Sequence, residues 1–182
     1  YSMRLDPKYF IPFMIVVALV GALLIALFTM HSQQSRRQDF HKRIMAQDSL
    51  RHEPLPEFGG SGSLNVADFK GKFVVLDFWS TWSNFSENSH EELAKVAEAY
   101  GDTLRVVAAV VADREEDVAS YIRRHEFPFR YVVGTAVFNK YGVPGVPTQL
   151  VYNPDNQLVS VFFGYTDPAR YDSLRTLIRN GD

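Results

Sequence analysis

The pattern of hydrophobic positions begins with a long apolar stretch. From Phe10 to Met30 the sequence carries no charged residue, and a helix rising about 1.5 Å per residue over this length spans roughly the 30 Å hydrocarbon core of a bilayer. Polar and basic residues follow directly, so we interpret residues 10–30 as a retained transmembrane anchor in the lipid bilayer rather than a cleaved signal peptide. Residues 1–9 then form a short N-terminal tail.

A polar stretch, residues 31–54, follows the apolar one. Its composition is typical of a juxtamembrane stalk, although a helix docked on a neighbouring subunit has the same pattern. Lys and Arg are more numerous after residues 10–30 than before them. By the positive-inside rule, this charge count places the C-terminal part of the chain in the cytoplasm.

From residue 55 to residue 182, apolar runs alternate with helical patterns. Phe73–Phe78 and Leu104–Val111 are near-continuous runs of β-forming residues, typical of strands covered on both faces. A helix is predicted between them at Asn84–Tyr100, with Gly101 as its end signal. The other predicted elements are helices at Asp113–His125, near Val137–Tyr141 and from Asp167-Pro168, and strands at Tyr131–Val133, Thr148–Tyr152 and Leu158–Phe163, the last two forming a hairpin. This order indicates an α/β fold with a mixed central sheet flanked by helices.

The composition adds one strong constraint, because the 182 residues include no cysteine. This absence excludes a disulfide framework, a thiolate nucleophile, a cysteine-ligated metal and attached haem. The formal net charge of -2 gives no indication of a nucleic-acid partner. No cluster of histidines or carboxylates has metal-ligand spacing, so we predict neither a metal nor a cofactor.

Two segments carry a family resemblance. LNVADFKGKFVVLDFWSTW and YGVPGVPTQLVYNPDNQLV, separated by helical patterns, resemble the membrane-anchored thioredoxin-like proteins of the TlpA/ResA type. The resemblance covers residues 55–182 and implies a thioredoxin-like fold preceded by one transmembrane helix. Family members are thiol-disulfide oxidoreductases on the outer face of the bacterial inner membrane, many of them serving cytochrome c maturation. The resemblance therefore implies a periplasmic domain, against the charge count, because folded domains can be translocated despite nearby basic residues.

The family motif is Trp-Cys-x-x-Cys, and Ser83 and Ser86 occupy its cysteine positions. A serine hydroxyl at a helix N-terminus stays protonated and forms no mixed disulfide, so this sequence excludes thiol-disulfide exchange. We expect Ser83 to cap the helix, with Asn84 and Glu87 as an alternative capping box. A hydrolytic interpretation pairs Ser86 as nucleophile with His90 as base one turn later, although the sequence shows no third member for such a site.

Three further positions match the family. Pro147 falls where thioredoxin-like proteins hold a cis proline facing the motif, and the backbone of Val146 would there pair with an extended partner segment. The alternative role of Pro147 is only to shape the loop before a strand. Asp77 matches a buried acid that assists proton transfer to the thiols in relatives. Without thiols it loses that task, and it must be hydrogen-bonded or protonated to be tolerated in a core.

Aromatic residues cluster around the motif. We expect Trp79 to pack in the core or at its rim. Trp82 and Phe85 lie where the resemblance implies a surface exposed to substrates, so they are either rim packing or a partner-binding patch. The partner-binding candidates are Trp82, Asn84, Phe85, Val146 and Pro147.

We therefore predict a redox-inactive thioredoxin-like domain, single-pass in the bacterial inner membrane, that acts as a binding or structural subunit of a membrane protein complex. The alternative is a thiol-disulfide oxidoreductase of the cytochrome c maturation type whose two cysteines were replaced by serine. Asn84 and Phe85 stand between the serines, where Gly-Pro or Pro-Thr is common between the family's cysteines. An engineered replacement would have left those two residues alone, so they favour natural loss, and the codons at both positions distinguish the two histories.

Overall fold

A computed structural model describes residues 7–165 and 168–181 of the chain. The chain divides into two compact units, the first ending at Asp39 and the second beginning at Phe40. Each unit is described by itself. The last helix is described from Ala169, and its predicted start at Asp167 lies outside the described residues.

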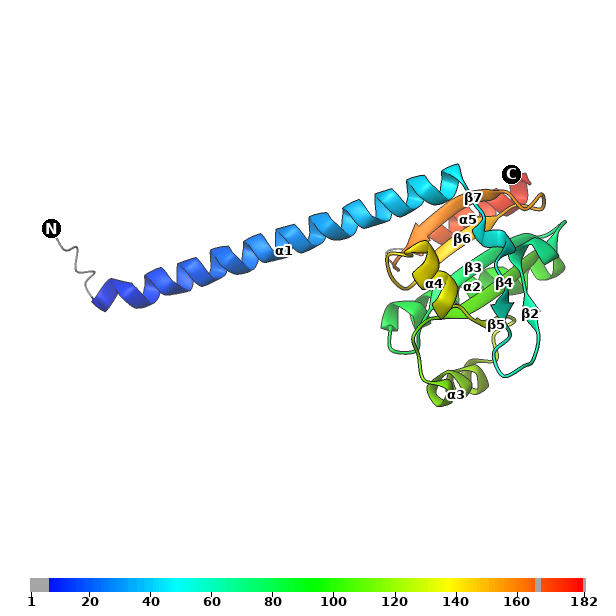
Figure 1. Ribbon diagram of the computed structural model, residues 1–182, viewed down its shortest axis with the longest axis horizontal. Coiled ribbons are helices and arrows are strands. Elements are labelled where there is room, and N and C mark those ends of the chain that lie inside the picture. The colour runs from blue at the N-terminus through cyan, green and yellow to red at the C-terminus, as the bar shows by residue number, and fades with distance from the viewer. Residues whose placement is uncertain (1–6, 166–167, 182) are drawn as a thin grey trace. The chain divides into compact units, whose positions relative to one another are not determined.

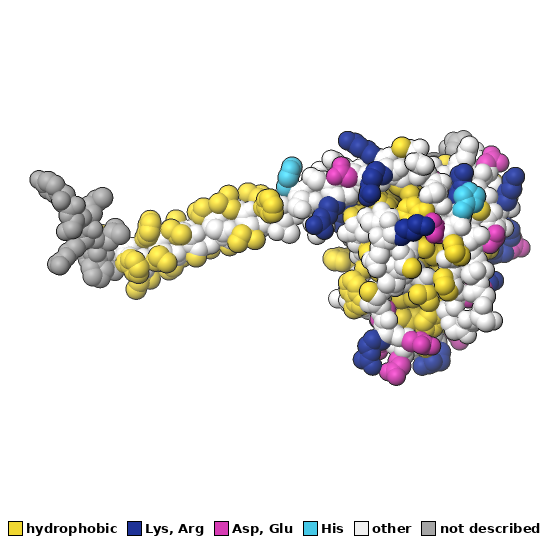
Figure 2. Space-filling view, in the orientation of Figure 1, with side chains coloured by type: hydrophobic (Ala, Val, Ile, Leu, Met, Phe, Trp, Pro, Cys, Tyr) yellow, Lys and Arg dark blue, Asp and Glu magenta, His cyan; other side chains and the backbone are white. Residues whose placement is uncertain are grey.

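The first unit contains most of one long helix, α1 (Pro7–Ala46). Side chains from Tyr9 to Met30 are exposed, apart from the half-buried Gly21, and the most apolar window has a mean hydropathy of 2.9. Hydrophobic side chains cover this part of the helix in Figure 2. A helix that is apolar on all sides and uncovered by protein has the length and composition of a membrane span, as the sequence predicted.

The second unit is built on a mixed five-stranded sheet with the order β5-β4-β3-β6-β7. Its strands are β3 (Phe73–Trp79), β4 (Leu104–Val110), β5 (Arg130–Val133), β6 (Thr148–Tyr152) and β7 (Leu158–Phe163). The pairs β3–β4 and β4–β5 are parallel, whereas β3–β6 and β6–β7 are antiparallel. β3 lies at the centre and is buried along its whole length, which explains its continuous apolar sequence.

Helices cover both faces of this sheet (Figure 1). On one face α2 (Asn84–Tyr100), α3 (Glu115–His125) and α5 (Ala169–Asn180) bury their apolar residues in one core cluster. On the other face α4 (Thr135–Tyr141) packs in a second cluster. Two short strands, β1 (Leu55–Pro56) and β2 (Ser63–Leu64), pair with each other around the GGSGS loop. The order of elements from β3 to β7 is the one predicted from the sequence.

The compact unit begins earlier than residue 55. Phe40, Ile44 and Leu50 are 1%, 3% and 0% exposed and belong to the second core cluster. The Phe40 ring packs edge-on against Phe163 of β7, with 6.1 Å between the ring centroids. Residues 40–54 are therefore part of the folded domain rather than a stalk, because two apolar side chains one helical turn apart dock the end of α1 on the sheet.

Candidate functional site

The degenerate motif lies between the end of β3 and the start of α2. Ser83 is the N-cap of α2, with extended backbone, and its Oγ accepts a hydrogen bond from the Ser86 N–H at 3.4 Å. The same N–H also reaches the Ser83 carbonyl at 2.9 Å. The predicted capping role of Ser83 is confirmed, whereas Asn84 is the first helical residue and does not cap the helix.

Both ends of the motif are tied into the loop below it. Ser86 is fully buried, and its Oγ accepts a hydrogen bond from the Ser80 N–H at 3.4 Å. Ser80 in turn donates its hydroxyl to the carbonyl of Val111 at 2.5 Å. These hydroxyls satisfy backbone groups that would otherwise be buried without partners. The chemistry of the motif serines in this fold is therefore structural.

The loop after β4 holds the other side of the motif. The Asp113 carboxylate accepts hydrogen bonds from the Thr81 N–H at 2.5 Å and from the Thr81 hydroxyl at 3.0 Å. Trp82 donates its Nε1–H to the carbonyl of Ala112 at 3.3 Å. The predicted helix start at Asp113 is wrong, since α3 begins at Glu115. Asp113 contributes its carboxylate to the motif instead.

Trp82, Asn84 and Phe85 form what we call the motif surface. Trp82 is 63% exposed and Phe85 is 59% exposed, and Asn84 between them is also exposed. Exposed large aromatic side chains that adjoin one another are uncommon unless something covers them in a complex. Trp79, by contrast, is 0% exposed, as predicted for a core residue.

The proline loop lies at the same edge of the sheet as the motif. The Val146–Pro147 peptide bond is cis, as predicted. Thr148, directly after it, pairs with Phe78 near the end of β3, so the two loops leave neighbouring strands side by side. Pro147 is buried and Val146 is half-buried. The sheet register thus gathers the predicted partner-binding residues at one edge.

Beneath the motif, Asp77 meets a histidine that belongs to α2. Asp77 and His90 are both 0% exposed, with 2.8 Å between Asp77 Oδ2 and His90 Nε2. The other ring nitrogen of His90 lies 2.9 Å from the hydroxyl of Tyr121 on α3. Both nitrogens of His90 are therefore engaged, and neither is available to Ser86. The hydrolytic pairing of Ser86 with His90 is wrong, because the ring serves Asp77 and Tyr121.

Burial keeps the phenols around this carboxylate protonated. Burial is the largest cause that raises the pKa of Tyr121, followed by nearby groups that include Tyr131, Glu87 and Asp77. The pKa of Tyr131 is also raised, first by burial and then by the charge of Asp77. Both hydroxyls consequently remain neutral hydrogen-bonding groups throughout the physiological pH range.

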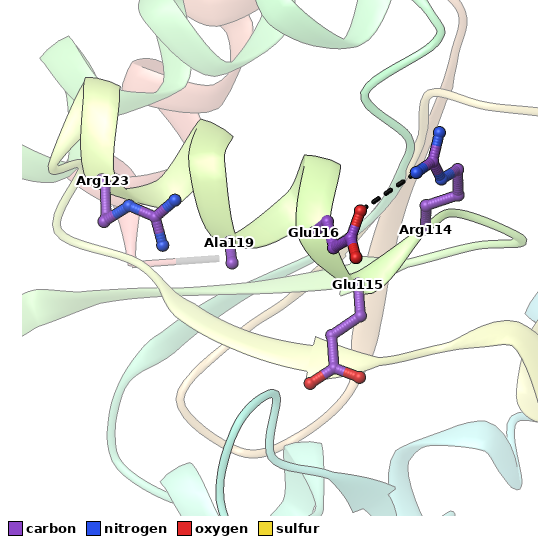
Figure 3. Close-up of a pocket in the computed structure, with 5 residues that line it drawn as sticks. All are labelled: Arg114, Glu115, Glu116, Ala119 and Arg123. Carbon is purple, nitrogen blue, oxygen red and sulfur yellow. Dashed lines mark hydrogen bonds and ion pairs between the residues drawn. The ribbon is translucent and has the colours of Figure 1, made fainter.

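The surface hollow in Figure 3 lies apart from the motif residues. It has a volume of ≈ 710 Å³ and is lined by side chains from the start of α3, including an ion pair between Arg114 and Glu116 at 3.0 Å. These side chains are exposed and solvated, so an ion pair of this kind contributes little binding energy. Within residues 7–165 and 168–181, no three side chains of His, Asp or Glu come together as metal ligands.

Comparison with known proteins agrees with this geometry. Residues 53–161 match the AhpC/TSA family. The chain belongs to the AhpC/TSA family. Among its relatives, the thiol-disulfide oxidoreductase ResA of Bacillus subtilis (strain 168) is 27% identical over 125 residues, which cover 65% of this chain and 68% of ResA. The thioredoxin-like protein YneN of the same organism is 25% identical over 153 residues, covering 80% of this chain and 89% of YneN. Against ResA of Bacillus cereus, the matched share of the relative is 60%.

Solved structures place this AhpC/TSA domain in the thioredoxin-like fold. A secreted disulfide oxidoreductase of Mycobacterium tuberculosis superposes with a TM-score of 0.61 at 19% identity, covering 74% of this chain and 99% of that structure. A thiol:disulfide interchange protein of Chlorobium tepidum TLS superposes with a TM-score of 0.60 at 19% identity, covering 69% and 92%. The predicted fold class, a thioredoxin-like mixed sheet flanked by helices, is confirmed.

Proposed function

We propose that this AhpC/TSA domain is redox-inactive and serves as a membrane-anchored binding or assembly subunit of a bacterial membrane protein complex. The observation that carries the proposal is the state of the motif. Ser83 and Ser86 fill the cysteine positions as a helix cap and a buried hydroxyl, while Trp82 and Phe85 beside them are exposed. A site with a recognition surface and no sulfur can bind a partner but cannot exchange disulfides with it.

The proposed location is the inner membrane, with the domain on the periplasmic side. The apolar part of α1 supports a single-pass anchor in the lipid bilayer through residues 10–30. One solved structure of the same fold is described as a secreted protein, which supports an extracytoplasmic side for the domain. The proposed partners are other protein subunits of the membrane complex, and nucleic acid is not among them.

The proposed contact combines the motif surface with the proline loop. The exposed aromatic rings of Trp82 and Phe85 supply apolar contact area, and Asn84 between them supplies hydrogen-bonding groups. The half-buried Val146 lies in the loop at the same sheet edge, where its backbone can pair with an extended segment of the partner. Aromatic residues at the centre of an interface carry much of its binding energy.

Replacement of both aromatic residues tests this proposal. We expect the full-length Trp82→Ala, Phe85→Ala variant, extracted from its native membrane in mild detergent, to retain about tenfold less of its membrane partners, because loss of a buried aromatic anchor at an interface typically costs about 2 kcal/mol or more. Quantitative mass spectrometry of the copurified subunits measures the effect. A Met45→Ala variant is the matched control, since Met45 is an exposed apolar side chain, 42% exposed, outside the motif. Equal copurification by all three proteins would contradict the proposal.

The second candidate function is a thiol-disulfide oxidoreductase whose cysteines were replaced by serine. The specific observation in its favour is that the ResA relatives bear that activity in their name and that the motif keeps its place in the fold, with Ser83 at the N-terminus of α2 and Asp77 buried beneath it. Cysteine codons at positions 83 and 86 of the gene would support this candidate, and serine codons would support the binding subunit.

A further inference from the structure

Three buried polar side chains from three different elements meet under the motif surface. They are Asp77 on β3, His90 on α2 and Tyr121 on α3, with exposed fractions of 0%, 0% and 3%. His90 bridges the other two through both of its ring nitrogens, at 2.8 Å from Asp77 and 2.9 Å from Tyr121. We call these residues the buried triad. It connects the helix that carries Phe85 to the central strand and to α3.

Each member of the buried triad depends on the others for its hydrogen bonds. Among the described residues, His90 is the one side chain bonded to the Asp77 carboxylate, whose other oxygen has no hydrogen-bond partner there. An ionised carboxylate only accepts, so His90 donates its Nε2–H to Asp77. Tyr121 then donates to Nδ1 when the ring is neutral and accepts from it when the ring is protonated. Separation of α2 from β3 or α3 would leave a buried polar group unsatisfied.

Aromatic packing fixes the His90 ring between these partners. Its centroid lies 4.6 Å from that of Trp79 and 5.2 Å from that of Phe129. Trp79 also packs on Tyr121, with 4.7 Å between the ring centroids. In such apolar surroundings a hydrogen bond is stronger, and its loss more costly, than at the surface. The triad therefore ties α2 firmly to its neighbours.

The tie lies close to the motif surface along the helix. His90 is five residues after Phe85, which corresponds to about 7.5 Å of helix. The loop side of the surface is held separately, by Thr81 on Asp113 and by Trp82 on Ala112. Both anchoring points lead to the same region, since Asp113 closely precedes α3 and Tyr121 lies on it. The loop that carries Trp82 and the helix that carries Phe85 are thus both referenced to α3.

We propose that His90 is a positioning residue, which through Asp77 and Tyr121 holds the start of α2 so that Phe85 and Trp82 present one pre-formed surface to a protein partner. The inference rests on the proposed function for the identity of that surface. A pre-formed surface loses less conformational entropy on binding, so it binds more tightly than a mobile one. The histidine that resembled a catalytic base in the sequence acts here through geometry alone.

Ser89 provides a matched control on the same helix. It is also 0% exposed, and its hydroxyl lies 2.7 Å from that of Tyr171 on α5 and accepts from Gln149 Nε2 of β6 at 2.7 Å. This second cluster ties α2 to α5 and β6 rather than to α3. Ser89→Ala and Tyr121→Phe both remove a buried hydroxyl with a small change in volume, so both proteins should fold.

The test compares the two variants as full-length proteins in mild detergent. Hydrogen exchange is measured at the Ser86 and Glu87 amides, which bond to the Ser83 carbonyl in the first turn of α2. We expect Tyr121→Phe to accelerate exchange there by about tenfold, the effect of one lost buried hydrogen bond, and Ser89→Ala to change it little. The same order should appear in the amount of membrane partner retained per folded molecule.

The outcomes separate this inference from the proposed function. Equal effects of both variants, or none in either, on first-turn exchange would overturn the positioning role of His90. Loss of partners in Trp82→Ala, Phe85→Ala without loss in Tyr121→Phe would overturn the positioning role and leave the proposed function intact. Faster exchange in Tyr121→Phe with no partner lost in any variant would refute the proposed function, while the triad would still be shown to order the helix start.

Discussion

The variant with Ser83→Cys and Ser86→Cys will form an intramolecular disulfide and gain thiol-disulfide exchange activity that the chain with serines lacks. Ser83 is the N-cap of α2, where the helix dipole and free N–H groups lower the pKa of a thiol and favour the reactive thiolate. The spacing of the two positions at the helix start and the buried Asp77 beneath them are both retained. Only the sulfur is missing.

Two measurements check this gain of activity. The oxidised double variant should lose the mass of two hydrogens, and it should catalyse the reduction of insulin by dithiothreitol. The Ser83→Cys single variant is the control, because it has a thiol at the same helix start but no second sulfur with which to close the ring. A double variant that stays reduced under air and glutathione disulfide would contradict the expectation, and would mean that the residues between the serines no longer fit a disulfide.

A fragment of residues 55–182 will be far less stable than one of residues 40–182. The shorter fragment lacks Phe40, Ile44 and Leu50, each at most 3% exposed in the second core cluster. Removal of one large core side chain costs roughly 2–5 kcal/mol, which is a large part of the stability of a small domain. We expect the shorter fragment to be partly unfolded or to aggregate, and the longer one to unfold cooperatively in urea.

The urea midpoint of each fragment is the measurement. Met45→Ala in the longer fragment is the control, because Met45 lies on the same helical segment but is 42% exposed, and its loss should shift the midpoint little. If the two fragments had the same midpoint, the burial of Phe40 and its neighbours would contribute nothing to stability, and the domain would begin at residue 55.

Local sequence signals were sufficient for most of the sheet and its helices. The predicted helix Asn84–Tyr100 matches α2 at both ends, because Ser83 caps its start and Gly101, with φ of 49°, ends it. The strands Thr148–Tyr152 and Leu158–Phe163 match as well, since the turn between them contains Pro, Asp and Asn. These features depend on neighbours in the chain, which sequence patterns record.

Features that depend on distant residues were not accessible in this way. Asp77, His90 and Tyr121 are separated by 13 and 31 residues, and nothing local to His90 indicates that its ring will lie between a strand and a second helix. Asp113 resembled an acidic helix start because the competing hydrogen bond comes from Thr81, 32 residues earlier. The docking of Phe40 was missed for a similar reason, since few apolar residues in a polar helix give only a weak periodic signal.

The hydroxyl at the start of α2 has one more consequence. A cysteine pair at this position would change its covalent structure and its charge with the oxidants of its surroundings, and the face beside it would change with them. Ser83 and Ser86 do neither, so the helix start has the same bonds and the same charge in an oxidising and in a reducing compartment. The domain is thereby insulated from the electron balance of the cell, and a complex built on its motif surface would stay assembled through a redox stress that alters the same helix start in a cysteine-bearing protein.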